Sequence, residues 1–172
     1  VANLRRSAEM ANVAASSLTP SVLAAARAVL SESQIENGVA VIDIGGSTTG
    51  VAVFEEGDLQ HVAVIPMGAQ NVTNDVAIGL KTDPEIAEAV KLAHARLGGG
   101  KAGRVDTKYD KQVYTFEQSE IDEIVEARYE EIFELVAKEL KRAGGIGRLP
   151  SGVVLVGGGA KVKDLVEFAK NS

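Results

Sequence analysis

Two glycine-rich turns, far apart in the chain, carry residue types that bind phosphorylated ligands. The first, Gly45-Gly46-Ser47-Thr48, directly follows an apolar run. Its glycines let backbone N–H groups approach a phosphate closely, and the two hydroxyls add hydrogen-bond donors. Asp43 precedes the turn, where a carboxylate could hold Mg²⁺ or a water molecule. The pattern indicates a phosphate site, although many turns of this composition serve only as turns.

Apolar residues on both sides of this first turn indicate how the chain holds it. Val39–Ile44 enters the turn and the β-branched run Val51–Phe54 leaves it. Such runs are typical of strands covered on both faces. The connection is too short for a crossover, so we expect an antiparallel hairpin. A dinucleotide-binding glycine loop would instead lead from a strand into a helix.

The second turn, Gly157-Gly158-Gly159-Ala160, lies between a short apolar run and an amphipathic segment. Its glycines would let a flat ring or a sugar lie against bare backbone, and a following helix would offer free N–H groups to negative charge. Close packing of a helix on a strand explains the glycines equally well. Taken together, however, one turn suits phosphates and the other suits a nucleoside.

The periodicity of apolar residues predicts the elements that must position these turns. Three strands joined by short turns should form a meander, and the longest helix carries Arg128 on an otherwise apolar stripe. The two histidines have no metal-like spacing, and we expect both on the surface. The expected helices are 2–13, 21–30, 72–80, 84–97, 118–143 and 162–170, and the expected strands are 14–18, 39–44, 51–54, 59–65, 104–107, 112–116 and 153–156.

The overall composition excludes several classes of protein. The chain has 172 residues, 45% of them hydrophobic, and a net charge of −6, which argues against nucleic acid as a partner. It has no cysteine, so disulfide and zinc-thiolate scaffolds are excluded and a reducing compartment fits. No apolar stretch approaches the ~20 residues of a membrane span, and no signal peptide is visible. Because the first residue is Val1, we expect a piece of a longer protein.

The linked motifs resemble the second half of the actin-like ATPases, which include actin, Hsp70 and MreB. The resemblance lies in an apolar strand, the pattern Asp-x-Gly-Gly-x-Thr, a returning strand and a later Gly-Gly-Gly-Ala turn. Within that group, Ala63–Gly68, Asn71–Leu80, Glu126–Tyr129 and Gly152–Ala160 resemble FtsA. FtsA is the bacterial division protein that ties the tubulin-like FtsZ ring to the membrane. The resemblance covers nearly the whole chain.

This resemblance implies an α/β fold, namely one lobe of an actin-like ATPase (ribonuclease H-like). The lobe would contain a mixed sheet with an antiparallel meander flanked by helices, plus a small α+β subdomain. Residues 1–69 and 144–172 resemble subdomain IIA, the nucleotide-facing part, and residues 70–143 resemble the helical subdomain IIB. The family's first phosphate loop belongs to the other lobe. Half a cleft should not hydrolyse ATP by itself, because catalysis needs groups fixed on both sides of the phosphate.

The resemblance also assigns roles to residues and implies ATP and Mg²⁺ as cofactors. It places Asp43 as the catalytic carboxylate that positions Mg²⁺, through water, or the attacking water; Gly45, Gly46, Ser47 and Thr48 as the second phosphate loop; Glu88 and Lys91 at ribose and adenine; and Gly158 and Gly159 at adenosine. The chain departs from the family pattern twice. Ser47 replaces a third glycine, which narrows the space for a β-phosphate, and Gly50 replaces an aspartate, which removes a carboxylate.

The implied partners are the acidic C-terminal tail of FtsZ and further copies of the same protein in a protofilament. The tail would bind the long helix at Arg128 and Lys138. Alternatively, the Arg128 stem lies along apolar surface and its head pairs with Glu131 one turn on. Membrane binding would occur only through a C-terminal amphipathic helix that these residues do not include. The intact protein would be cytoplasmic and peripheral at the inner face of the cell membrane.

Three functional hypotheses follow. The first is an ATP-binding scaffold of bacterial cell division that links the FtsZ ring to the membrane. The second is a protein-interaction module that keeps the actin-like fold without nucleotide binding. Ser47 and Gly50 favour the module, whereas Asp43 and Gly157–Ala160 favour the ATP-binding scaffold. The third is a relative of the same fold that serves type IV pilus assembly or acts as a chaperone.

Overall fold

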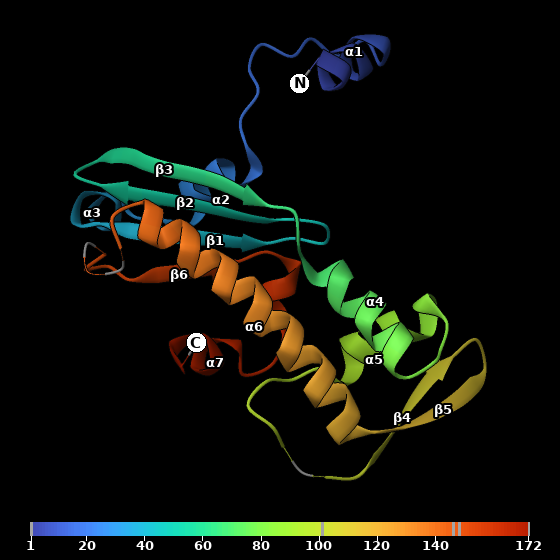
Figure 1. The fold of residues 1–172 in the computed structure, drawn as a ribbon. Helices are drawn as coiled ribbons and strands as arrows, with labels where there is room; N and C mark the ends of the chain where they lie inside the picture. The colour runs from blue at the N-terminus through green and yellow to red at the C-terminus, as the bar shows by residue number, and fades with distance from the viewer. Residues whose placement is uncertain (1, 101, 146, 148, 172) are drawn as a thin grey trace.

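A twisted sheet and a helical part, joined by one long helix, make up the protein (Figure 1). This computed structural model describes residues 2–100, 102–145, 147 and 149–171. The sheet contains β1 (Val39–Ile44), β2 (Thr49–Glu55), β3 (Asp58–Ile65) and β6 (Val153–Val156), in the order β3-β2-β1-β6. Neighbours β1, β2 and β3 pair antiparallel, and β6 pairs parallel to β1. The predicted hairpin and meander are therefore confirmed.

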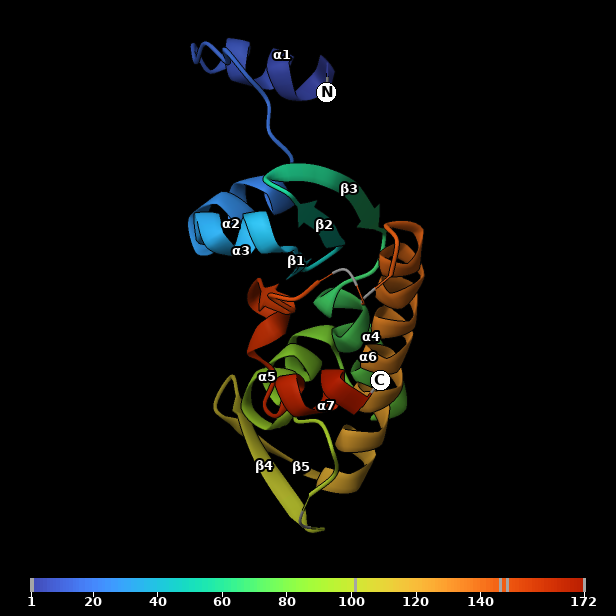
Figure 2. The same ribbon diagram turned by 90° about the vertical axis from the view of Figure 1, so that its left-hand side faces the viewer.

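The sheet is covered on both faces, which explains its near-continuous apolar runs. Helix α2 (Ser21–Val29) packs on one face, where Val22 and Ala26 form a small cluster with Val41 and Ala52. Helix α6 (Gln118–Arg142) crosses the opposite face (Figure 2). Because successive side chains of a strand point to opposite faces, the residues on either side of Val41 join the larger core under α6.

The helical part consists of α4 (Ala69–Gly79), α5 (Pro84–His94), the first half of α6 and a hairpin. The hairpin strands are β4 (Arg104–Tyr109) and β5 (Gln112–Glu117), and they confirm the predicted pairing. Asp110 and Lys111 form the connecting turn with positive φ angles of 45° and 64°. One continuous apolar core runs from β1 through α4 and α5 to α6.

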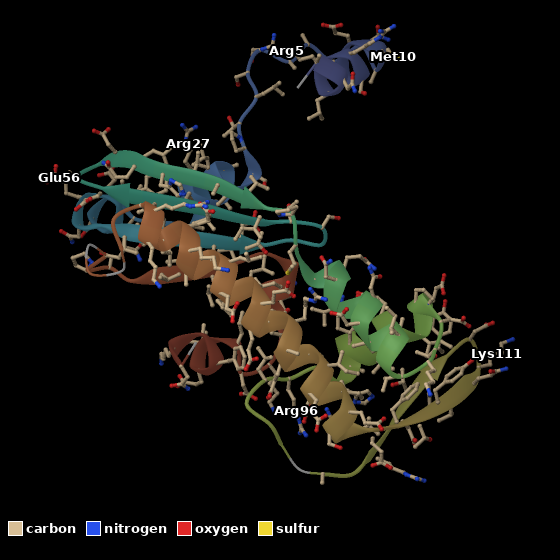
Figure 3. The ribbon with its side chains drawn as sticks, viewed as in Figure 1. Arg5, Met10, Arg27, Glu56, Arg96 and Lys111 are labelled. Atoms are coloured by element: carbon tan, nitrogen blue, oxygen red, sulfur yellow. The ribbon has the colours of Figure 1, made fainter. Side chains whose placement is uncertain are left out.

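The N-terminal segment corrects one prediction. Helix α1 (Ala2–Met10) stands clear of the sheet, and Arg5 and Met10 lie far from the rest of the molecule (Figure 3). The strand predicted for 14–18 does not form, and all five of its residues are exposed. A strand needs a neighbour to pair with its backbone, and in the described part of the chain this segment, which connects α1 to α2, pairs with none of the sheet strands (Figure 1).

Helix boundaries differ from the prediction at several places: α1 ends at Met10 rather than 13, α4 (Ala69–Gly79) begins before residue 72, and three further differences follow. A second short helix, α3 (Glu32–Asn37), follows α2, because Ser31 forms a capping box with Gln34. Helix α5 ends at His94 rather than near residue 97. The C-terminal helix is split into a 3₁₀ turn, η2 (Gly158–Lys161), and α7 (Leu165–Asn171). No helix in the described parts of the chain is long and apolar enough to cross a membrane.

Gly50 has a packing role that its sequence context did not reveal. It lies in β2 opposite Asp43, and it is buried beneath α2. A Cβ atom at this position would lie 2.7 Å from the Cβ of Val22. An aspartate would not fit here, because α2 lies too close to the sheet at Gly50 to leave room for a side chain.

Replacing Gly50 with alanine is expected to destabilise the protein by about 1–3 kcal/mol, the usual cost of overpacking a filled site. The matched control is Gly46→Ala, because a Cβ at Gly46 meets no atom within 4 Å. Both free energies of unfolding can be measured by denaturant titration of the intact protein. A Gly50→Ala variant as stable as Gly46→Ala would contradict the packing role of Gly50.

Candidate functional site

The two glycine turns lie at the same end of two neighbouring parallel strands and face one cavity of about 440 Å³. Five of the predicted site residues line it: Gly46, Glu88, Lys91, Gly158 and Gly159. The other lining residues are Ala69, Gln70, Leu92, Ala95, Tyr129, Lys161 and Val162. Residues from opposite ends of the chain are thus brought together at the carboxyl ends of β1 and β6, the usual position of ligand sites in α/β sheets.

The first turn is fixed by the start of α4. Within the turn, the amide of Gly45 donates to the carbonyl of Thr48 over 2.9 Å. From α4, the amides of Ala69 and Gln70 donate to the carbonyls of Gly45 and Gly46 over 2.9 and 2.7 Å. These two amides belong to the first turn of the helix, where donors lack helical partners. Helix α4 therefore holds the turn through backbone groups.

Gly68 makes this docking possible, a role that we did not predict from the sequence. A Cβ at Gly68 would lie 2.6 Å from the carbonyl oxygens of both Gly45 and Gly46. The signal in the sequence is the break Pro66-Met67-Gly68, where the third strand ends and α4 begins. Only a residue without a side chain fits between the hairpin turn and the helix.

The two hydroxyl residues of the first turn are exposed and do not line the cavity. Ser47 and Thr48 lie at the tip of the hairpin, so their role as phosphate donors remains a prediction. The next residue, Thr49, is buried and donates its hydroxyl hydrogen to the carbonyl of Met67 over 2.8 Å. This bond ties the start of β2 to the segment that leads into α4.

Asp43 lies between the two turns. It is the partly exposed residue near the end of β1, and its carboxylate oxygen would be 2.6 Å from a Cβ at Gly157. Within the parts of the chain that the structure describes, no three His, Cys, Asp or Glu residues gather in a possible metal site. Mg²⁺ commonly binds through one or two carboxylates, several waters and the phosphates of its ligand. A single carboxylate beside two glycine turns fits an ion that accompanies a phosphorylated ligand.

The second turn is packed against the end of β1. Gly157 has a φ of +94° and would place a Cβ 2.5 Å from the carbonyl oxygen of Ile44, so a larger residue would be strained there. Gly159 is buried, and a Cβ at that position would collide with the side chain of Ile44. On its other side, the phenol of Tyr129 donates to the carbonyl of Gly159 over 2.7 Å.

Glu88 and Lys91, one turn apart on α5, form a network with Thr73 of α4. The ammonium of Lys91 lies 2.6 Å from the Glu88 carboxylate and 2.7 Å from the Thr73 hydroxyl, which in turn donates to Glu88. Burial would raise the pKa of Glu88, but the hydrogen bonds from Lys91 and Thr73 and the charge of Lys91 together lower it. Glu88 is therefore ionised at neutral pH, and the network fixes both side chains at the cavity wall.

The remaining wall of the cavity combines apolar and basic groups that we did not predict from the sequence. Leu92 lines the cavity although its side chain is 76% exposed, and Ala95 and Val162 add apolar surface. Lys161 contributes a second cation. A flat heterocycle needs apolar surface beside polar edge groups, and a phosphate needs cations and amides. This cavity offers both.

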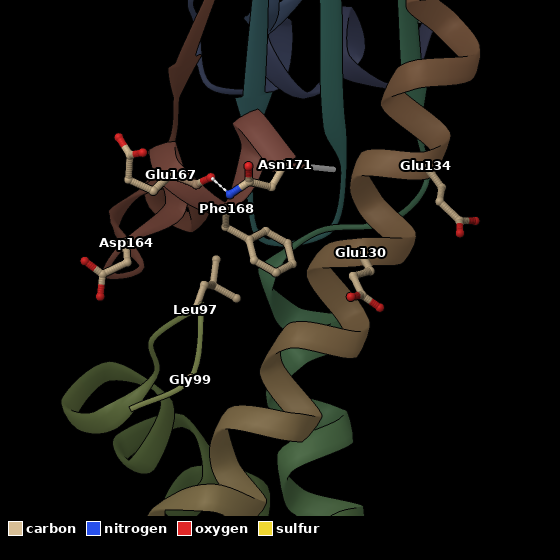
Figure 4. Close-up of a pocket in the computed structure, with 9 residues that line it drawn as sticks. Leu97, Gly99, Glu130, Glu134, Asp164, Glu167, Phe168 and Asn171 are labelled. Atoms are coloured by element: carbon tan, nitrogen blue, oxygen red, sulfur yellow. Dashed lines mark hydrogen bonds between the residues drawn. The ribbon is translucent and has the colours of Figure 1, made fainter. Parts of the chain in front are cut away.

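A larger cavity, of about 580 Å³, lies on another side of α6 and has a different character. Its walls carry Glu130 and Glu134 from α6 and Asp164 and Glu167 from the α7 region, over an apolar floor that includes Leu97 and Phe168 (Figure 4). Four carboxylates would repel a polyanion. The smaller cavity is therefore the better candidate for a phosphorylated ligand.

Arg128 lies on the face of α6 that meets α4. Its guanidinium donates to both oxygens of Asp75, over 2.5 and 3.0 Å, and it pairs with Glu131 at 2.5 Å. The hydrogen bonds that Arg128 donates to Asp75 raise the pKa of Arg128, burial opposes this, and the charges of Asp75 and Glu131 add to the rise. The predicted pair with Glu131 is present, and Asp75 is an additional partner. Arg128, which is partly buried, and Ile78, which is exposed, line the same shallow pocket of about 320 Å³.

Three other residues noted in the sequence, Lys138, His61 and His94, do not line the cavity at the glycine turns. Lys138 is exposed on the same helix but does not line the pocket at Arg128. The two histidines are not the simple surface residues that we expected. His61 lies 2.9 Å from Glu139 with a side chain only 24% exposed. The Nε2 atom of His94 is buried and has no hydrogen-bond partner among the described residues.

Solved structures of the actin-like class share this architecture. The structure of MreB5 from Spiroplasma citri bound to ADP superposes with a TM-score of 0.81 at 20% identity, covering 99% of this chain and 56% of that one. The mixed sheet, its meander and the paired glycine turns therefore define one lobe of an actin-like fold, as predicted.

Sequence similarity identifies the family to which the chain belongs. The family model "Cell division protein FtsA" matches residues 40–172. The FtsA proteins of Bacillus subtilis and Pseudomonas aeruginosa are 42% and 40% identical over 174 and 153 residues, which cover 98% and 86% of this chain. The chain belongs to the FtsA family of cell division proteins. It spans 39% and 37% of the lengths of these two relatives.

The buried phenol gives the protein an alkaline pH dependence. Burial raises the pKa of Tyr129 to about 12, against about 10 in an unfolded chain. The neutral form is favoured in the fold, so this contribution is complete below pH ~10 and is lost as the pH rises toward ~12. Between pH 9 and 11 the wild-type protein should lose about 1 kcal/mol more unfolding free energy than a Tyr129→Phe variant. Denaturant titrations at several pH values give both unfolding free energies. An equal loss in the wild type and in Tyr129→Phe between pH 9 and 11 would contradict this prediction.

Proposed function

We propose that this chain is the second, nucleotide-facing lobe of an ATP-binding scaffold in bacterial cell division. One observation carries the proposal: Gly46, Glu88, Lys91, Gly158 and Gly159, from three separate segments, line a single cavity of nucleotide size. In this proposal residues 1–69 and 144–172 form subdomain IIA and residues 70–143 form subdomain IIB. The FtsA family and the actin-like fold support it.

The cavity suggests how Mg·ATP would be held. The backbone of Gly46 would face the phosphates, with Asp43 holding Mg²⁺ through water. Glu88 and Lys91 would contact ribose and adenine, and the Gly158-Gly159 backbone would pack against the nucleoside. The structure of MreB5 that resembles this chain is described as bound to ADP. Hydrolysis would require groups from the opposite lobe as well, so this chain alone is not proposed to be an ATPase.

The surface at Arg128 is proposed to bind the acidic tail of FtsZ. The pocket offers a cation beside exposed apolar surface at Ile78, which suits an amphipathic acidic peptide. Arg128 is already paired with Asp75 and Glu131, so a peptide carboxylate would have to replace one of these partners. The intact protein would join the FtsZ ring to the cytoplasmic face of the membrane through a segment outside these residues, and would assemble with further copies into protofilaments.

The alternative is an interaction module that binds no nucleotide, and one observation favours it: Ser47 and Thr48 lie off the cavity wall. Mg·ATP added to the intact protein decides between the two. A ligand at 100 times its Kd adds about 2.7 kcal/mol of stability, so the melting temperature should rise by several degrees. A Gly158→Ala variant should fold, because a Cβ there meets no atom within 4 Å, yet its methyl group should reduce the shift by covering backbone that the nucleoside would contact. No shift in the wild type at millimolar Mg·ATP would leave only the module.

For the tail surface, Arg128→Glu is the direct test. Reversal of this partly buried charge should weaken binding of an FtsZ tail peptide at least ~10-fold. Lys138→Glu, an identical charge change on the same helix, shows whether Lys138 extends the site. Fluorescence anisotropy of a labelled peptide gives both affinities, and melting curves confirm that the variants are folded. Unchanged affinity in Arg128→Glu would remove this residue from the site.

A further inference from the structure

Tyr129 connects the long helix α6 to the second glycine turn, a role that the Glu126–Tyr129 motif did not indicate. The residue is 3% exposed, and its hydroxyl donates to the carbonyl of Gly159 over 2.7 Å. Its side chain also lines the cavity that contains Gly158 and Gly159. The phenol is therefore both a wall of the cavity and a support of the turn.

The turn is fixed from two sides. The end of β1 packs against it, because no Cβ fits at Gly157 or Gly159 beside Ile44. The phenol of Tyr129 holds Gly159 from α6. Within the turn, the amide of Ala160 donates to the carbonyl of Gly157 over 3.2 Å, a longer bond than the one from Tyr129. Of these two hydrogen bonds to the glycine backbone, the one from the phenol of Tyr129 is therefore the shorter.

A hydroxyl is not needed to fill this position, since a phenyl ring would occupy almost the same volume. Burying a hydroxyl is costly unless it makes a hydrogen bond, and removing it leaves the Gly159 carbonyl without that donor. The hydrogen bond from Tyr129 therefore fixes the backbone conformation of the second glycine turn, whose glycines have no side chains that could hold it.

We propose that Tyr129 is a positioning residue for nucleoside binding: its buried hydroxyl fixes the Gly159 carbonyl and so sets the surface against which the nucleoside lies. The proposal rests on the nucleotide-binding function proposed above. It does not extend to the phosphates, which would face the first turn, held by α4 rather than by α6. This separation makes the role of Tyr129 testable.

The experiment compares ATP with inorganic tripolyphosphate, both with Mg²⁺, on the intact protein by isothermal titration calorimetry. In Tyr129→Phe the Kd for ATP should rise ~3- to 10-fold, the effect of one lost hydrogen bond. The Kd for tripolyphosphate should stay within about twofold, because that ligand does not use the second turn. Tyr114→Phe is the matched control, since that phenol bonds Gln112 in the exposed hairpin. Unchanged ATP affinity, or equal weakening of both ligands, would overturn the proposal.

Hydrogen exchange separates this proposal from the proposed function. Amides of residues 158–162 should exchange at least ~10-fold faster in Tyr129→Phe than in the wild type or in Tyr114→Phe. If the wild type binds no ATP, the proposed function fails, and unchanged exchange would then overturn the positioning role as well. If Tyr129→Phe does not fold, 3-fluorotyrosine at position 129 replaces it. Its ¹⁹F resonance should move with ATP and not with tripolyphosphate, and a resonance that ignores ATP would overturn the proposal.

Discussion

The parallel pairing of β1 with β6 is the constraint on which the candidate site depends. In this register Asp43 lies opposite Val156, so the two strands end at the same edge of the sheet. The hairpin turn leaves one strand and the glycine turn leaves the other. Neither turn has a side chain large enough to separate them, and Gly157 meets the backbone of Ile44 directly. The cavity therefore follows from strand pairing and from the absence of Cβ atoms.

A second layer of backbone contacts attaches the helical part to this edge. The amides at the start of α4 reach the carbonyls of Gly45 and Gly46, and Gly68 allows that approach. From the other direction, Tyr129 of α6 reaches the carbonyl of Gly159. Each bond is worth only about 1 kcal/mol. Together they attach α4 and α6 to the two turns, and α5 is joined to the start of α4 where Lys91 donates to the carbonyl of Ala69 over 3.2 Å.

Much of this arrangement could be predicted from the sequence, because it depends on local patterns. Alternating and continuous apolar runs define the hairpin, and two glycine clusters mark the turns. The strand predicted for 14–18 was wrong because this segment pairs with no neighbouring strand. Helix α3 was missed because its signal, the capping box of Ser31 and Gln34, lies within a short polar stretch.

The residues that escaped prediction share a physical reason: their roles depend on contacts distant in the sequence. Gly50 is constrained by Val22 and Gly68 by the hairpin turn, and neither neighbour is visible from the local pattern. Tyr129 falls on the buried face of α6, where an aromatic residue is expected for packing alone. Its hydroxyl acquires a role only once Gly159, 30 residues later, is placed beside it. Asp75 is likewise 53 residues from Arg128.

Charge explains why one cavity rather than another suits a polyanion. The chain carries a net charge of −6, so a phosphorylated ligand needs a local excess of cations and amides. The larger cavity carries four carboxylates, whereas the smaller one carries Lys91 and Lys161 beside the single carboxylate of Glu88. Lys91 is held there by Glu88 and Thr73, which fixes a cation at the wall with its ammonium already desolvated in part. Because Glu88 and Lys91 are already held in this network, little free energy is needed to order their side chains when a ligand replaces water.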